Sequence, residues 1–346
     1  MGNPKIWFDI GTPFNCNLVD AIIQHLGDFS ETLITCRDHD HIIDILSAKK
    51  MDFIPIGRHG GKSLKGKLQA YAERVTLLAD VVEKEKPNLL ITERDPSAVR
   101  TAFGFGIPAW TVFYDEREYH TNWMVFPLSN RIFVPSFYDS PELVQHGVTL
   151  NRVTWFNGFH TAFLKDEWSQ LNTKNSSSHD KLKILIRPEF EFATFFKTEK
   201  TPILEQVVDL LIENDHNIEL VVFPRTESQR EVFSKYPDVV FIEENTMDCP
   251  VLDVDLVIGA AETMLMEAFV LLKPAISAIY WKQSKPVQFL LQYIDHSTDP
   301  KSVVQLAEKY FDKNEREKFS HKAKEVVDKM DNLGLLMAEE VKKHFS

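Results

Sequence analysis

Short apolar runs alternate with longer amphipathic segments along most of the chain. In the first half, the apolar runs cover residues 5–11, 31–37, 53–57, 88–93, 109–115 and 131–135. The segments between them have helical spacing and cover residues 15–27, 39–50, 64–86, 96–104, 117–128 and 141–147. Buried strands separated by helices are typical of βαβ units, which form a parallel sheet covered on both faces.

The same pattern restarts after a polar break. Residues 165–180 are rich in Ser and Asn and have no periodicity, which is typical of a linker. Beyond them, apolar runs follow at 181–188, 218–225, 239–244, 254–260 and 274–280. We therefore predict an α/β protein with two Rossmann-like, doubly wound parallel-sheet domains that face a cleft. The predicted domains are residues 1–164 and residues 181–346, with the charged helices of the tail assigned to the second.

Composition and charge exclude several classes of protein. A chain of 346 residues with 44% hydrophobic and 26% charged residues is long enough for two ordinary globular domains. The net charge of −12 disfavours nucleic acid as a partner, and broad contact with anionic membranes is not indicated. The three cysteines lack C-x-x-C spacing, so we expect no zinc site and a cytoplasmic location. The start of the chain shows no secretory pattern, and no apolar run reaches 18 residues.

The loop Gly60-Gly61-Lys62-Ser63 lies between a predicted strand and a predicted helix, as in a P-loop. A P-loop needs glycine at position 56, where this chain has Ile56, so ATP is not predicted. The helix at 64–86 is expected to face the core with Leu64, Leu68, Ala72, Val75, Ala79 and Val82. Lysines near its start indicate a bound anion, or are simply solvated. The predicted acceptor- or anion-binding residues are Thr12, Asn15, His59, Gly60, Gly61, Lys62 and Ser63.

Ligands of parallel sheets collect at the carboxyl ends of the strands, so polar residues there are candidates for chemistry. Asp115 and Glu118 follow the strand at 109–115, and a carboxylate facing a cleft can take a proton from an attacking hydroxyl. We predict these two residues as the catalytic base. The alternative is a solvated first turn of the next helix, where acids favour the helix dipole.

In the second half, Arg187 and Glu189 follow a strand, and a guanidinium there can pair with phosphate or with a structural acid. Arg225 follows the next strand in the same way. The turn at 259–261 consists of small residues and leads into a helix, whose N-terminus favours phosphate. The predicted nucleotide- or phosphate-binding residues are Arg187, Glu189, Gly259, Ala260, Glu262, Thr263 and Glu267.

Six short motifs then point to a family. "KIWFDI", "HGGKS", "AFGFGIP", Asn157-Gly158, "RPE" and "VIGAAETMLMEA" occur in the order seen in the DUF354 family of archaeal and bacterial proteins, which this chain resembles over about residues 5–300. That uncharacterised family is similar to the GT-B glycosyltransferases, which include MurG-like transferases and UDP-N-acetylglucosamine 2-epimerases. The resemblance implies that the C-terminal half binds a nucleotide sugar, with Glu267 on the ribose, and that the N-terminal half binds the acceptor. It also implies that no metal or cofactor is needed.

The chain departs from the family pattern at three places. Ala261-Glu262-Thr263 replaces Gly-Gly-Thr, and the Glu262 carboxylate would repel a diphosphate at the helix start. Asn15 and Asn17 replace histidines, and His160-Thr161 replaces a Lys-Glu pair. The leading hypothesis is a metal-independent glycosyltransferase that uses a nucleotide-activated sugar. The alternatives are an epimerase or hydrolase of such a sugar, and a non-catalytic member that binds a glycan or nucleotide.

Overall fold

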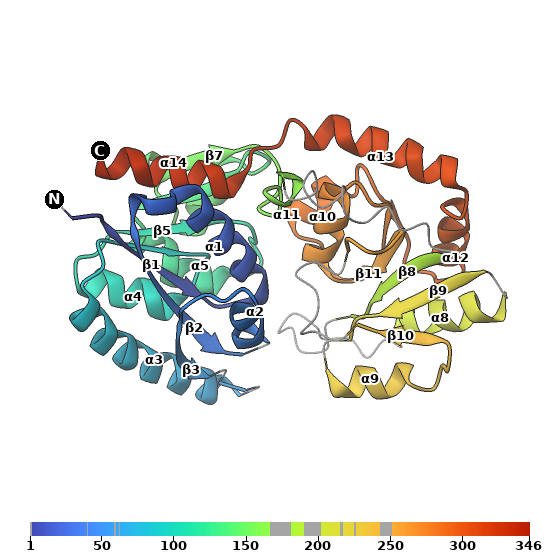
Figure 1. Ribbon diagram of the computed structural model, residues 1–346, viewed down its shortest axis with the longest axis horizontal. Helices are drawn as coiled ribbons and strands as arrows, with labels where there is room; N and C mark the ends of the chain where they lie inside the picture. Colours follow the sequence, from blue (N-terminus) through green and yellow to red (C-terminus); the bar gives the residue numbers. More distant parts are fainter. Residues whose placement is uncertain are drawn as a thin grey trace. The chain divides into compact units, whose positions relative to one another are not determined.

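The computed structural model divides into two compact units. Unit 1 comprises Met1–Phe163 and Asp331–Ser346, and unit 2 comprises Leu164–Met330 (Figure 1). The structure describes residues 2–39, 41–58, 60–61, 63–166, 181–189, 202–214, 217–224, 226–242 and 251–346. The predicted boundaries placed all of 181–346 in the second domain, whereas the end of the chain belongs to unit 1. Most of the predicted linker lies outside the described residues.

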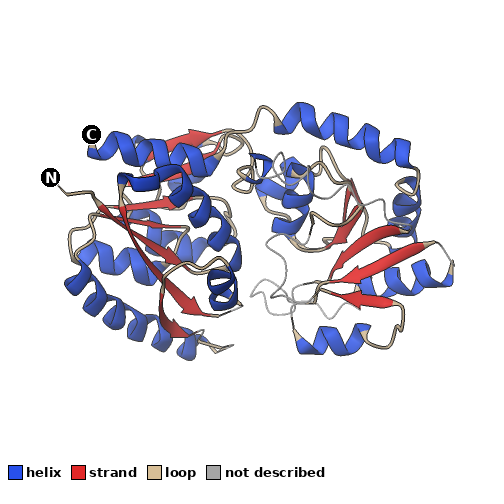
Figure 2. Ribbon diagram, viewed as in Figure 1, coloured by secondary structure: helices blue, strands red, loops and turns tan. Residues whose placement is uncertain are grey.

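Unit 1 contains a seven-stranded parallel sheet with the order β3-β2-β1-β4-β5-β6-β7 (Figure 2). Its strands are β1 (Lys5–Ile10), β2 (Glu31–Asp38), β3 (Ile54–Arg58), β4 (Leu89–Thr92), β5 (Ala109–Val112), β6 (Arg131–Pro135) and β7 (Val153–Phe156). Its helices are α1 (Pro13–Leu26), α2 (Ile42–Ala48), α3 (Leu64–Glu85), α4 (Pro96–Gly104), α5 (Tyr119–Val125), α6 (Ser140–Gln145) and α14 (Leu333–Phe345). The predicted alternation of strands and helices is therefore present.

Unit 2 contains a six-stranded parallel sheet with the order β10-β9-β8-β11-β12-β13. Its strands are β8 (Leu182–Arg187), β9 (Ile218–Val222), β10 (Val239–Phe241), β11 (Leu256–Gly259), β12 (Ala275–Ser277) and β13 (Asp295–His296). Its helices are α8 (Ile203–Glu213), α9 (Glu227–Phe233), α10 (Glu262–Val270), α11 (Lys285–Leu290), α12 (Pro300–Lys309) and α13 (Lys313–Val327). The sequence did not predict β13, because a strand of two polar residues has no apolar run.

The strand order reverses once in each sheet. In unit 1, the chain passes from β1 outward to β3 and then returns to the other side of β1 as β4. In unit 2, the same reversal falls between β8 and β11. Loops that leave the carboxyl ends of such neighbouring strands diverge, so a crevice for ligands forms there. We therefore expect ligand-binding residues directly after β1, β4, β8 and β11.

The C-terminal helix α14 completes unit 1 by packing on α1. The two helices approach closely, because a Cβ atom added to Gly334 would lie 3.1 Å from the Cβ atom of Ala21. Lys342 Nζ donates a hydrogen bond of 2.8 Å to the carbonyl of His25, at the end of α1. Among the described residues, no helix is both long enough and apolar enough to span a membrane.

Only part of the apolar stripe predicted for helix α3 is buried. Leu64 is 82% exposed and Leu68 is 67% exposed, so the first turns of the expected apolar stripe face solvent. The buried residues of α3 are Arg74, Leu78 and Val82. The predicted stripe is therefore right at Val82 and wrong at its first turns, where this helix leaves leucines in solvent and places the Arg74 cation against the sheet instead.

Candidate functional site

A buried ion network lies at the carboxyl edge of the sheet in unit 1. Arg74 is 1% exposed, and its Nη2 atom donates to Asp9 Oδ1 at 2.7 Å. Its Nη1 atom donates to Asp95 Oδ1 at 2.8 Å, and its Nε atom donates to the carbonyl of Ile56 at 2.9 Å. One guanidinium therefore joins the ends of β1, β3 and β4. Gly57 has φ 76°, and an added Cβ atom there would meet the Arg74 side chain at 3.1 Å, which explains the glycine.

The pKa values of the two acids in this network are shifted in opposite directions. Burial raises the pKa of the Asp9 carboxyl, against the charge of Arg74. Burial acts in the same direction on Asp95, but the guanidinium groups of Arg74 and Arg37 hold the pKa of that carboxyl below its usual range. Asp95 also caps α4 by accepting hydrogen bonds from the backbone N–H groups of residues 97 and 98, at 2.8 and 3.0 Å. The network is thus satisfied internally and fixes the loops around it.

Glu93 directly follows β4 and reaches the loop that follows β1. Its Oε2 atom accepts hydrogen bonds from Thr12 Oγ1 at 3.0 Å and from Asn15 Nδ2 at 2.5 Å. The residue is 8% exposed, and burial raises the pKa of its carboxyl. Thr12 and Asn15, which the sequence predicted as acceptor or anion ligands, are therefore brought together around an acid. Glu93 was not among the residues predicted from the sequence, although its position directly after a strand was the available signal.

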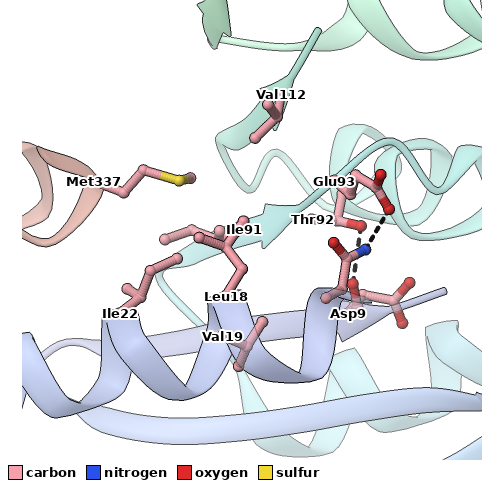
Figure 3. A pocket seen from close by; sticks show the side chains of 10 residues that line it. Asp9, Leu18, Val19, Ile22, Ile91, Thr92, Glu93, Val112 and Met337 are labelled. Carbon is pink, nitrogen blue, oxygen red and sulfur yellow. Dashed lines mark hydrogen bonds between the residues drawn. The ribbon is translucent and has the colours of Figure 1, made fainter. Parts of the chain in front are cut away.

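A small cavity opens beside this cluster in unit 1. At its polar end lie Asn15 and Glu93 with Asp9 and Thr92, and its remaining wall is apolar (Figure 3). The apolar lining comes from α1, β4, β5 and α14 and consists of Leu18, Val19, Ile22, Ile91, Val112 and Met337. The Oδ1 atom of Asn15 is buried and has no hydrogen-bond partner in the described part of the chain.

An aromatic stack holds the neighbouring loops. The Arg94 guanidinium lies 4.5 Å above the ring of Tyr114, and the ring of His160 stacks at 4.5 Å from the same ring. Phe14 packs edge-on against His160, with ring centroids 4.6 Å apart. Burial, together with the charge of Arg94, lowers the pKa of His160 to about 3, so its imidazole is neutral at physiological pH. His160 thus acts in packing in this structure.

The predicted catalytic acids have partners of their own. The Oδ2 atom of Asp115 pairs with Arg117 Nη2 at 2.9 Å, and its Oδ1 atom accepts from Arg117 Nε at 2.9 Å. Although burial acts in the opposite direction, the hydrogen bonds from Arg117 and the charge of Arg94 lower the pKa of Asp115. Glu118 is half-buried just before α5, and Thr121 Oγ1 donates to it at 3.4 Å. Since a lowered pKa weakens a general base, the catalytic role of Asp115 stays a prediction without added support.

The glycine-rich loop before α3 has a structural explanation. A Cβ atom added to Gly60 would lie 2.5 Å from the carbonyl oxygen of Gly66, so the loop passes directly against the first turn of the helix. Ser63 caps α3 by accepting a hydrogen bond of 3.0 Å from the N–H of Gly66. Gly61 has φ 72°, where glycine is favoured. His59 and Lys62 lie outside the described residues, so anion binding by this loop stays a prediction.

In unit 2, Arg187 ends β8 beside Gly259 of β11, at the reversal of strand order. Its Nη1 atom donates to the carbonyls of Phe223 at 2.6 Å and Pro224 at 3.2 Å. Its guanidinium also lies 4.0 Å above the Phe223 ring. A Cβ atom added to Gly259 would lie 3.2 Å from the Cβ atom of Arg187, so a small residue is required. Arg225 lies outside the described residues.

The turn after β11 leads into α10, whose first residues were predicted to bind phosphate. The cap residue Ala261 has no side chain that could satisfy the first N–H groups of the helix. The Glu262 carboxylate is turned to Ser284 Oγ at 2.8 Å and to Trp281 Nε1 at 3.3 Å. Thr263 is half-buried in the first turn. Glu262 thus serves as an acceptor for residues that precede α11, and it keeps a negative charge near the helix start.

Glu267 lies one turn further along α10. Burial raises the pKa of its carboxyl to about 7, and the charge of Arg187 acts in the opposite direction. In the described part of the chain, no side-chain or backbone donor forms a hydrogen bond with this carboxyl. Glu267 is therefore an available acceptor close to the same strand reversal as Arg187.

Glu189 has a structural role in this unit. Its Oε1 atom accepts hydrogen bonds from the backbone N–H groups of Ile203 at 2.8 Å and Leu204 at 3.2 Å, so it caps α8. The residue is 7% exposed. Since these bonds explain the acid, they give no support to its predicted contact with a nucleotide. The described residues also contain no group of three His, Cys, Asp or Glu residues arranged to hold a metal ion.

Comparison with known proteins gives a family and a fold. The family model described as "Protein of unknown function (DUF354)" matches residues 4–344. An uncharacterized protein of Methanocaldococcus jannaschii is 27% identical over 324 residues, which is 89% of this chain and 92% of that protein.

Several solved structures share the architecture of both units. The Staphylococcus aureus MnaA–UDP co-structure has a TM-score of 0.72 at 17% identity and covers 99% of this chain and 96% of its own. The UDP-GlcNAc 2-epimerase of Neisseria meningitidis bound to UDP-GlcNAc has a TM-score of 0.68 at 15% identity, over 98% of this chain and 100% of its own. Anabaena HepE in complex with UDP and glucose has a TM-score of 0.62 at 10% identity, over 99% of both chains. These likenesses show a GT-B-like fold and confirm the predicted fold class.

Proposed function

Since the chain belongs to the DUF354 family of proteins of unknown function, we propose, from its GT-B-like fold and the residues of unit 2, that it binds a nucleotide-activated sugar and acts as a metal-independent glycosyltransferase. The observation that carries the proposal is the strand reversal between β8 and β11. There, Arg187, the small-residue turn at 259–261, the start of α10 and the carboxyl of Glu267 lie on neighbouring elements. Such a reversal is where doubly wound sheets bind nucleotides.

Each of these groups suits one part of a nucleoside diphosphate. The turn has only small side chains, so phosphate oxygens can approach the backbone N–H groups at the start of α10. The Arg187 guanidinium adds positive charge beside this turn. Glu267 supplies an acceptor for the hydroxyl groups of a ribose, one helical turn away.

The Glu262 carboxylate is the feature least suited to a diphosphate. Its hydrogen bonds with Ser284 and Trp281 direct it toward the segment before α11 rather than along the axis of α10. Part of its charge is therefore offset by donors, and a phosphate at the helix start meets less repulsion. Glu262→Gln removes the remaining charge, so we expect this variant to bind UDP more tightly than the natural protein does.

A second candidate function is epimerisation or hydrolysis of the nucleotide sugar. The observation in its favour is the structural likeness to a UDP-GlcNAc 2-epimerase solved with UDP-GlcNAc. A third candidate, binding without catalysis, is favoured by the pairing of Asp115 with Arg117. Incubation with UDP-GlcNAc separates the three by their products. Hydrolysis releases UDP with an equal amount of free sugar, transfer releases UDP without free sugar, epimerisation changes the sugar, and binding alone leaves UDP-GlcNAc intact.

The test of the proposal is a titration of the full chain with UDP and GDP, followed by calorimetry and thermal denaturation. A ligand at a hundred times its dissociation constant adds about 2.7 kcal/mol to the free energy of unfolding. We expect Glu267→Gln to weaken binding about tenfold, because it replaces one of the two carboxyl oxygens, which can accept a hydrogen bond, by an amide group that only donates. Glu325→Gln, an exposed acid on α13, is the matched control. Absence of binding to both nucleotides would contradict the proposal.

A further inference from the structure

One layer of helices in unit 1 carries long stretches without charged residues. Helices α3, α4, α5 and α6 lie on the same face of the sheet, because buried side chains from each of them belong to one hydrophobic core. Residues 101–114, 119–130 and 143–151 contain no Asp, Glu, Lys or Arg, although these types make up 26% of the chain. These three segments include the end of α4, all of α5, and the end of α6 with the turn that follows it. Surface helices normally carry charged residues, so this layer is unusual.

Large apolar side chains are exposed on the same three segments. Within the described residues, seven of the 17 exposed large hydrophobic side chains lie there, each 42–57% exposed. We call them the apolar surface of unit 1, and they are Phe103, Phe105, Tyr119, Trp123, Met124, Val144 and Leu150. At about 200 Å² for a large side chain, their exposed parts amount to roughly 600 Å². This area is at the upper end of the largest apolar patch on a typical monomer, which points to a partner.

Contacts between the segments connect this surface. Helix α4 packs against α5. Trp123 Nε1 donates a hydrogen bond of 2.9 Å to the carbonyl of Gln145, which joins α5 to the end of α6. Arg152 Nη1 donates to the carbonyl of Pro127 at 3.2 Å, so the short helical turn Leu150–Arg152 is held against the segment that follows α5. The exposed apolar side chains therefore lie on connected elements of one layer.

Charge and area together indicate which partner covers the apolar surface. An anionic membrane would repel a chain of net charge −12, and the three segments supply no lysine or arginine to attract it. The centres of interfaces between proteins are depleted of charged residues and enriched in Trp, Tyr, Phe and Met. Two copies of an acidic chain repel each other, so they can meet most easily through a face that brings no like charges together. The exposed area is also close to the roughly 800 Å² that each partner buries in an interface of standard size.

We propose that the apolar surface of unit 1 is the interface of a dimer of two copies of this chain. A two-fold axis brings the same surface of both copies together, and a surface that is apolar and uncharged is complementary to itself. This inference does not depend on the proposed function, because unit 1 supplies the whole surface and no nucleotide takes part in the contact.

The test is sedimentation velocity of the full chain over a range of protein concentrations, without nucleotide. We expect a species of twice the mass of the chain that dissociates on dilution. Met124→Lys should weaken the dimer about tenfold or more, because it places a charge within the apolar contact on both sides of the axis. Leu335→Lys, on α14 of the same unit, is the matched control, since Leu335 is 41% exposed and Met124 is 42% exposed. The control should dimerise like the natural protein.

Three results would overturn the inference. The first is a monomer at every concentration. The second is a dimer whose affinity is unchanged in both Met124→Lys and Phe103→Lys, which would mean that another surface is used. The third is a monomer that binds neutral phosphatidylcholine vesicles and loses this binding in Met124→Lys, which would assign the surface to a membrane. If neither variant folds, hydrogen exchange of the natural protein decides, since the amides of α5 must exchange more slowly in the dimer than in the monomer.

Discussion

Replacing Arg74 by methionine should destabilise unit 1 severely. Methionine keeps much of the apolar stem of arginine and removes the guanidinium, so the change acts mainly on charge and hydrogen bonds. Arg74 is 1% exposed and donates to both oxygens of Asp9, at 2.7 and 3.1 Å, as well as to Asp95 and to Ile56. In the variant, Asp9 stays buried at 1% exposure without a cation.

The size of the effect follows from these contacts. Removing one partner of a buried ion pair costs about 3–5 kcal/mol, because the remaining charge is left uncompensated. Asp95 keeps its ion pair with Arg37, so most of the loss falls on Asp9, which keeps only the hydrogen bond from Thr35. For a unit of this size, each kcal/mol lowers Tm by about 2–4 °C, so the total fall is roughly 6–20 °C.

The assay is urea denaturation of the full chain, followed by a signal from unit 1 such as the near-ultraviolet band of its tryptophans. Arg100→Met, an exposed arginine on α4, is the matched control and should change stability by less than about 0.5 kcal/mol. Adding Asp9→Asn to Arg74→Met should restore part of the loss, since a neutral amide needs no cation. A loss in Arg74→Met as small as that in Arg100→Met would refute the assignment of Arg74 as the cation on which Asp9 depends.

Two further predictions concern unit 2. Glu189→Ala should lower the stability of unit 2 by about 0.5–2 kcal/mol, because α8 loses its cap, and should leave UDP affinity unchanged. Denaturation and calorimetry measure the two quantities, with Glu213→Ala, at an exposed acid, as the control. A loss of UDP affinity would contradict the capping role. The pKa of Glu267 is raised from 4.5 to about 7, so its protonated form stabilises the fold fully below pH 4.5, and this contribution is lost as pH rises through about 7. Glu267→Gln should therefore flatten the fall in stability between pH 5 and 8 in urea denaturation, and identical profiles would show that the carboxyl is not shifted.

The sequence predicted the order of strands and helices well because each element carries its own local pattern. The helix predicted at 96–104 is α4 (Pro96–Gly104), where Asp95 caps a helix that begins with proline. The strand predicted at 131–135 is β6 (Arg131–Pro135). Helical spacing, capping residues and β-branched runs each depend on a few neighbouring residues, so they can be recognised from the sequence without knowledge of the fold.

The site was harder to predict because its contacts join distant parts of the chain. Glu93 bonds to Thr12 and Asn15, which lie 81 and 78 residues away. Arg74 was not predicted to be buried, because the apolar residues of α3 suggested another buried face. Its partner acid, Asp9, is 65 residues away in the sequence. The sequence did identify the strand ends that carry the candidates, and only the sheet order could show which of them become neighbours.

The attachment of α14 to α1 has a consequence for how the protein is made. Asp331–Ser346 belong to unit 1, so the whole of unit 2 is inserted between the first part of unit 1 and its last helix. During synthesis, more than 300 residues are translated between α1 and α14, which is the helix that covers it. Until then, the α1 surface around Ala21 that Gly334 covers stays open to chaperones or to other chains. Deleting the last helix would therefore damage the part of the protein that is translated first.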